Sequence, residues 1–157
     1  MNTQLLYLAA APFEAAARVV VLPPGHRSRG LHGHGYLASV RAASADGAEG
    51  LAARLAAAVA PLDYSYLNDT LEVPTDENVA RWIRKRLDDA QIDAVGIQST
   101  REQGVDLDRT NRAHLWRRFR FEAAHQLPGV RAGHPGGRMH GPGFRGCPHL
   151  GEGIADR

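Results

Sequence analysis

The chain has 157 residues, with 19 Lys and Arg against 17 Asp and Glu, and a net charge of +2 that is only mildly basic. The one basic cluster, at residues 117–120, favours a solvated strand face over a nucleic-acid-binding patch. No apolar run is long enough to cross a bilayer, so we expect neither a nucleic acid nor a membrane as partner. The single cysteine, Cys147, excludes an intrachain disulfide framework and favours a cytoplasmic location.

The first part of the chain has the pattern of strands separated by a loop. Residues 4–13 and 18–22 are apolar and partly β-branched, which predicts a first strand and its continuation. Residues 23–30 contain the Pro and Gly residues of a loop. From His34 to Ala42 apolar side chains occupy every second position, which predicts a half-buried strand.

Two helices and two more strands are predicted next. Residues 47–62 carry an apolar stripe at helical spacing, made of Leu51, Leu55, Val59 and Leu62. Thr75 is a good N-cap for a second helix, whose apolar face contains Val79, Ile83 and Leu87. Residues 92–99 and 105–107 are predicted strands. This order of elements predicts an α+β fold, with an antiparallel sheet and helices on one face.

Several short motifs occur twice, always 108 positions apart. Phe13-Glu14-Ala15-Ala16-Ala17 recurs as Phe121-Glu122-Ala123-Ala124-His125. Leu31-His32-Gly33-His34-Gly35-Tyr36 recurs as Met139-His140-Gly141-Pro142-Gly143-Phe144. A constant offset without gaps indicates a duplicated domain. We therefore predict one domain over residues 1–110 and a truncated second copy over residues 113–157, with its first strand beginning near Leu115.

The two copies differ at their histidines. His32 and His34 lie two positions apart on a strand, so both imidazoles point to the same side and can meet one metal ion. The second copy has His125 where the first has Ala17, and Pro142 where the first has His34. A catalytic zinc site usually takes three protein ligands, so each copy lacks one. Histidines that bind no metal are the alternative. The candidate ligands are His32, His34, His125 and His140.

These motifs, with Leu62-Asp63-Tyr64-Ser65-Tyr66-Leu67-Asn68-Asp69 and Pro74-Thr75-Asp76-Glu77-Asn78, resemble the 6-pyruvoyl-tetrahydropterin synthase family. The bacterial 6-carboxytetrahydropterin synthase branch of queuosine biosynthesis is the most similar. The resemblance implies a tunnelling fold: a four-stranded antiparallel sheet with two helices, in the order ββααββ, assembled into homo-oligomeric rings. It also implies a zinc-dependent lyase that converts a pterin triphosphate, dihydroneopterin triphosphate, to 6-carboxytetrahydropterin.

The resemblance further implies a cysteine as general base, an Asp–His pair that assists it, and a glutamate that holds the pterin ring. Asp63 matches the aspartate of the pair and is the candidate catalytic residue. Ser28 replaces the cysteine, Tyr64-Ser65 replaces the histidine, and Ser99 replaces the glutamate. A serine is a far weaker base than a thiolate. We therefore expect the first copy, taken alone, to be catalytically impaired.

Three functional hypotheses stay open. In the first, His125 combines with His32 and His34 to complete a zinc site, within one chain or across a ring. In the second, the chain is a non-catalytic tunnelling-fold subunit that forms a wall of a neighbour's site. In the third, it is an inactive fragment with an exposed, unpaired strand at residues 115–127. Zinc content, ring assembly and pterin binding distinguish the three.

Overall fold

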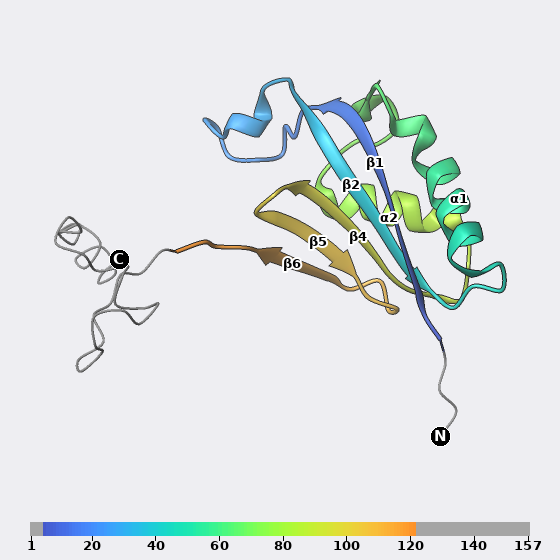
Figure 1. Ribbon diagram of the computed structural model, residues 1–157. Helices are drawn as coiled ribbons and strands as arrows, with labels where there is room; N and C mark the ends of the chain where they lie inside the picture. The colour runs from blue at the N-terminus through green and yellow to red at the C-terminus, as the bar shows by residue number, and fades with distance from the viewer. Residues whose placement is uncertain (1–4, 122–157) are drawn as a thin grey trace, which may run out of the picture. The chain divides into compact units, whose positions relative to one another are not determined.

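The computed structural model describes residues 5–121. The chain divides into two units, Met1–Arg118 and Phe119–Arg157, and the described residues lie almost wholly in the first. The first unit is a mixed α+β domain with one six-stranded sheet in the order β3-β1-β2-β4-β5-β6 (Figure 1). The strands are β1 (Tyr7–Ala17), β2 (His32–Ala42), β3 (Ser65–Tyr66), β4 (Ile92–Thr100), β5 (Gln103–Leu107) and β6 (Ala113–Arg117).

The four expected strands form the centre of this sheet and are antiparallel to their neighbours. Two further strands extend it beyond the expected four. The short β3 pairs parallel to β1, and β6 pairs antiparallel to β5. The sheet is therefore larger than the expected four-stranded one and is not wholly antiparallel.

Two helices, α1 (Gly47–Val59) and α2 (Asp76–Leu87), lie on the same face of the sheet (Figure 1). The helices cover this face because buried and exposed side chains alternate along the strands. In β1 one face is buried, while Leu8 and Glu14 on the other face are exposed. The buried face packs against helix residues such as Leu55 and Ile83, both 0% exposed. No helix in the described part of the chain is long and apolar enough to span a membrane.

The end of β1 differs from the sequence-based prediction. Residues 13–17, expected to interrupt the strand, pair in register with residues 32–36 of β2. Residues 18–22, expected to continue it, form a loop instead. The strand ends here because the Asn68 side chain bonds the backbone of Arg18. Its oxygen accepts from the Arg18 N–H at 2.8 Å, and its NH₂ group donates to the Arg18 carbonyl at 3.0 Å. The amide thus takes the place of a neighbouring strand.

Strand β6 contains the first residues of the predicted second copy. The register places Trp116 opposite Gly104, and a Cβ on Gly104 would lie 2.5 Å from the Trp116 ring. Only glycine therefore allows this ring to pack so closely on β5. The expected unpaired strand at 115–127 is paired with β5 over its first residues, up to Arg117. The rest of the second copy, from residue 122 on, lies outside the described residues.

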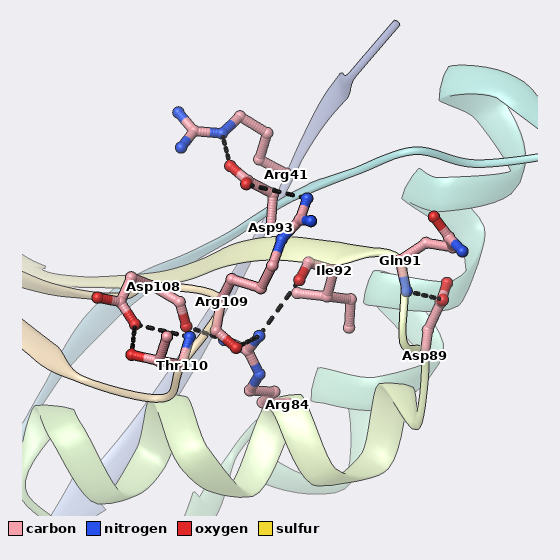
Figure 2. Close-up of polar contacts among 9 residues, drawn as sticks. All are labelled: Arg41, Arg84, Asp89, Gln91, Ile92, Asp93, Asp108, Arg109 and Thr110. Carbon is pink, nitrogen blue, oxygen red and sulfur yellow. Dashed lines mark hydrogen bonds and ion pairs between the residues drawn. The ribbon is translucent and has the colours of Figure 1, made fainter. Parts of the chain in front are cut away.

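Arg84 connects α2 to the strands that follow it (Figure 2). Its guanidinium donates to the carbonyl oxygens of Asp108 at 2.6 Å, Ile92 at 3.2 Å and Arg109 at 3.3 Å. These carbonyls lie at the start of β4 and in the turn between β5 and β6. Since a buried or half-buried carbonyl needs a donor, Arg84 fixes the end of α2 relative to this edge of the sheet.

The turn between β5 and β6 is organised by Asp108. Its carboxylate accepts hydrogen bonds from His114 at 2.9 Å, from the Thr110 hydroxyl at 2.7 Å, and from the backbone N–H groups of Thr110 and Arg112. The His114 bond, followed by the bonds from Thr110 and Arg112, holds the pKa of the Asp108 carboxyl well below its usual range.

We expect Asp108→Asn to lower the melting temperature by a few degrees at neutral pH, and to matter less in acid. Because the folded-state pKa of Asp108 is depressed, its contribution is present above the unfolded-state pKa of about 3.9 and is lost as the pH falls through the folded-state value. Thermal unfolding of both proteins from neutral to acidic pH measures this. Asp106→Asn, which removes an exposed carboxylate of β5, is the matched control. If Asp108→Asn lowers the melting temperature equally at neutral and acidic pH, the ionised Asp108 carboxylate is not the stabilising group.

Candidate functional site

A cavity of about 660 Å³ opens at one end of the helix-covered face of the sheet. Its walls come from the start of β2, the end of β4, the first residues of α2, and parts of β5, β6 and the loop that follows β1. We call it the histidine cavity. Among the polar and aromatic side chains that line it are Ser28, His32, His34, Asp76, Ser99 and Trp116.

The two histidines of the motif share this cavity, as their spacing on a strand predicts. Their ring centroids are 6.0 Å apart. Nδ1 of His32 lies 2.9 Å from the Gly30 carbonyl oxygen, and Nδ1 of His34 lies 3.1 Å from that of Gly35. A carbonyl only accepts, so each Nδ1 carries the hydrogen. The Nε2 lone pair of each ring is therefore available to a ligand.

Asp76 is a cavity residue that the sequence analysis had not selected. It is the first residue of α2, and its carboxylate accepts a hydrogen bond from the Ser99 hydroxyl at 2.5 Å. Burial raises the pKa of this carboxyl above its usual range, and the Ser99 bond opposes that rise. Burial, together with the nearby Asp76 charge, raises the pKa of Tyr36 to about 12. The contact between Asp76 and Ser99 joins segments that are 23 residues apart, which a local pattern does not reveal.

A family model described as 6-pyruvoyl tetrahydropterin synthase matches residues 9–110. The chain belongs to the 6-pyruvoyl tetrahydropterin synthase family. Among solved structures, one titled "Structure of Caenorhabditis elegans 6-pyruvoyl tetrahydropterin synthase" is similar at 20% sequence identity. The similarity covers 73% of this chain and 96% of that chain, with a TM-score of 0.49.

Members of the 6-pyruvoyl tetrahydropterin synthase family typically depend on a metal ion, so the fit of this domain to zinc can be tested. Ala17 lies directly opposite His32 in the pairing of β1 with β2, and it is 1% exposed. A methyl group therefore occupies the place beside the two histidines where a third ligand would stand. Among the described residues, no group of three or more His, Cys, Asp or Glu is arranged to hold a metal ion. The described residues do not fit a three-histidine zinc site.

The substituted family positions also lie in the histidine cavity. Ser28, which replaces the expected cysteine, and Ser99, which replaces the expected glutamate, both line it. The Ser99 hydroxyl is committed to Asp76. A serine hydroxyl is itself a poor proton acceptor, so neither Ser28 nor Ser99 supplies the base that a thiolate would supply.

Asp63, the candidate catalytic residue, lies apart from this cavity. Its carboxylate accepts from the Glu14 backbone N–H at 2.9 Å, and the next residue, Tyr64, donates its N–H to the Glu14 carbonyl at 2.6 Å. Tyr64 has a φ of 51°, in the left-handed region, which turns the chain back toward β1. In this domain Asp63 thus holds the segment before β3 against the edge of β1.

The remaining candidate ligands, His125 and His140, lie outside the described residues. The structure therefore brings together two of the four predicted zinc ligands, His32 and His34. Their pairing was predictable because strand periodicity alone sets it. The cavity around them was not, because it forms from segments that are distant in sequence.

Proposed function

We propose that this domain is a 6-carboxytetrahydropterin synthase-type domain that holds a pterin in the histidine cavity but does not convert it with its own residues alone. One observation carries the proposal: buried Ala17 pairs with His32, and His32 and His34 together line the histidine cavity. In this proposal the histidine cavity is the ligand-binding cavity, and the described residues supply no third metal ligand.

The reaction of the 6-carboxytetrahydropterin synthase branch supports a domain that binds a pterin without converting it. Conversion of dihydroneopterin triphosphate to 6-carboxytetrahydropterin requires proton removal from the substrate side chain, hence a general base within hydrogen-bond reach. In the histidine cavity, Ser28 presents a hydroxyl and Asp76 a carboxyl bound to Ser99. His32 and His34 each retain an Nε2 lone pair that can accept a hydrogen bond from a ligand hydroxyl. In this proposal these groups bind and orient a polar side chain, and conversion fails because the described residues supply no third ligand for the metal that would polarise the substrate.

Members of this family act as oligomers, which supports a place for the domain in an assembly. Leu8 and Leu37 on the helix-free face of the sheet are 70% and 40% exposed. Single exposed apolar side chains are common on protein surfaces, so these two leave that face open to a partner without selecting one. We therefore propose that the domain joins a homo-oligomeric ring in the cytoplasm as a non-catalytic wall, with catalysis depending on a complete copy.

The decisive experiment measures zinc per chain and turnover of dihydroneopterin triphosphate by the full-length protein. We expect well below one zinc per chain after dialysis, and no formation of 6-carboxytetrahydropterin, since two histidines form an incomplete site. Parallel measurements on His32→Ala and His125→Ala determine which histidines hold any zinc that is found.

One zinc per chain that is lost in both variants would show that the two copies combine their histidines. Together with turnover, it would overturn the proposal in favour of an active lyase. The oligomeric state of the same preparation, measured by light scattering, tests the ring. A monomer would contradict the structural role in an assembly.

A further inference from the structure

The Asp76 carboxylate lines the histidine cavity, where His34 lies close enough to act on its charge, and it makes no ion pair with a described residue. One of its oxygens accepts from Ser99, and no other hydrogen bond or ion pair of this carboxylate occurs in the part of the chain that the structure describes. A half-buried carboxylate needs donors for the lone pairs that water does not reach. The second oxygen is therefore free to accept hydrogen bonds from a ligand in the cavity.

The position of Asp76 is set by two rigid elements. Asp76 begins α2, which is anchored in the core through Val79 and Ile83, each 0% exposed. Ser99 lies near the end of β4 and is 6% exposed. The short bond between the two side chains joins helix to strand and leaves the carboxylate little rotational freedom. A carboxylate fixed in this way loses little entropy when it binds a ligand.

The two acceptor oxygens of the Asp76 carboxylate indicate which kind of ligand it binds. A carboxylate recognises two adjacent N–H donors by paired hydrogen bonds, as in its bidentate pairing with guanidinium. The 2-amino-4-oxo ring of a pterin presents such an edge, with its ring N–H beside the amino group. His34 and Tyr36, whose ring centroids are 4.1 Å apart, add aromatic surface to the same cavity.

Resting on the proposed function, we infer that Asp76, positioned by Ser99, holds the 2-amino-4-oxo edge of the pterin. Ser99 occupies the position at which the family resemblance places a glutamate, and Asp76 lies 2.5 Å from its hydroxyl. The carboxylate of the site has thus moved from the end of β4 to the start of α2. Asp76 is the binding residue, and Ser99 is a positioning residue.

The test compares two ligands that differ at this edge. Pterin carries the 2-amino group, whereas lumazine, the 2,4-dioxo analogue, carries a carbonyl there that a carboxylate repels. Fluorescence titration of the full chain with each ligand gives the ratio of the two dissociation constants. We expect the wild type to favour pterin by at least about tenfold, and Asp76→Asn to abolish that preference.

Two further variants make the assignment specific. Asp69→Asn makes the same change at an exposed position outside the cavity and should keep the preference. The double variant Asp76→Asn with Ser99→Glu returns a carboxylate to the end of β4, and we expect it to restore the preference for pterin. A merely structural role of Asp76 would not be rescued in this way.

The outcomes separate the inference from the proposed function. If the wild type favours pterin and folded Asp76→Asn favours it equally, the inference is overturned while pterin binding stands. If the wild type binds neither ligand, both are overturned. If Asp76→Asn does not fold, Ser99→Ala decides, because an unchanged ligand ratio in that variant would overturn the positioning of Asp76.

Discussion

Ala17→His is expected to convert the domain into a zinc-binding protein, raising its zinc affinity about a hundredfold. Structural zinc sites contribute roughly 10–16 kcal/mol through four ligands, so one added ligand is worth about 3 kcal/mol. The new side chain would project beside His32, because directly opposed residues on neighbouring strands share a face. Competition titration with a chromogenic chelator measures the affinity. Added zinc should also raise the melting temperature of the variant, since only the folded state holds the site.

Two controls make this result interpretable. Ala16→His adds the same side chain one position earlier, where strand alternation directs it to the opposite face. The double variant Ala17→His with His32→Ala removes one of the three ligands. Both should bind zinc as weakly as the wild type. A histidine at buried position 17 costs about 1–3 kcal/mol of packing, so melting temperatures without zinc must be recorded as well. A folded Ala17→His protein with unchanged zinc affinity would refute the three-histidine geometry.

Ile83→Ala should destabilise the domain by about 2–5 kcal/mol and lower its melting temperature by about 10 °C or more. Ile83 is 0% exposed and lies in the core where α2 packs on the sheet. Truncation removes apolar burial and leaves a cavity that the rigid sheet cannot fill. Urea and thermal denaturation measure the loss, and the urea slope shows whether unfolding stays cooperative.

The comparison for this prediction is Lys85→Ala, an exposed substitution on the same helix that keeps helix propensity high. It should change the free energy of unfolding by less than about 0.5 kcal/mol. Equal effects of the two substitutions would mean that α2 is not packed as described. Because α2 carries Asp76, Ile83→Ala should also weaken pterin binding through the position of its first residue.

Much of the fold was predictable because periodicity is a local property. Alternation along residues 34–42 and the stripe at Leu51 and Leu55 depend only on neighbouring positions, and the structure has β2 and α1 there. The end of β1 was not predictable in this way. Residues 13–17 are rich in alanine, which favours helix, but pairing with β2 holds them in a strand. Asn68, 50 residues from Arg18, ends the regular pairing.

The candidate site also has a part that the sequence predicts and a part that only tertiary contacts form. The His32–His34 pair follows from strand geometry, and comparison of the two repeated motifs shows alanine at position 17 where the second motif has a histidine. Contacts between distant segments form the rest of the site. They create the cavity, the bond between Asp76 and Ser99, and the bond that holds Asp63 against β1. Spacing within a single element records which side chains share a face. Which elements meet, and which carboxylate enters the cavity, depends on how the helices pack on the sheet, and that packing energy is distributed over the whole core.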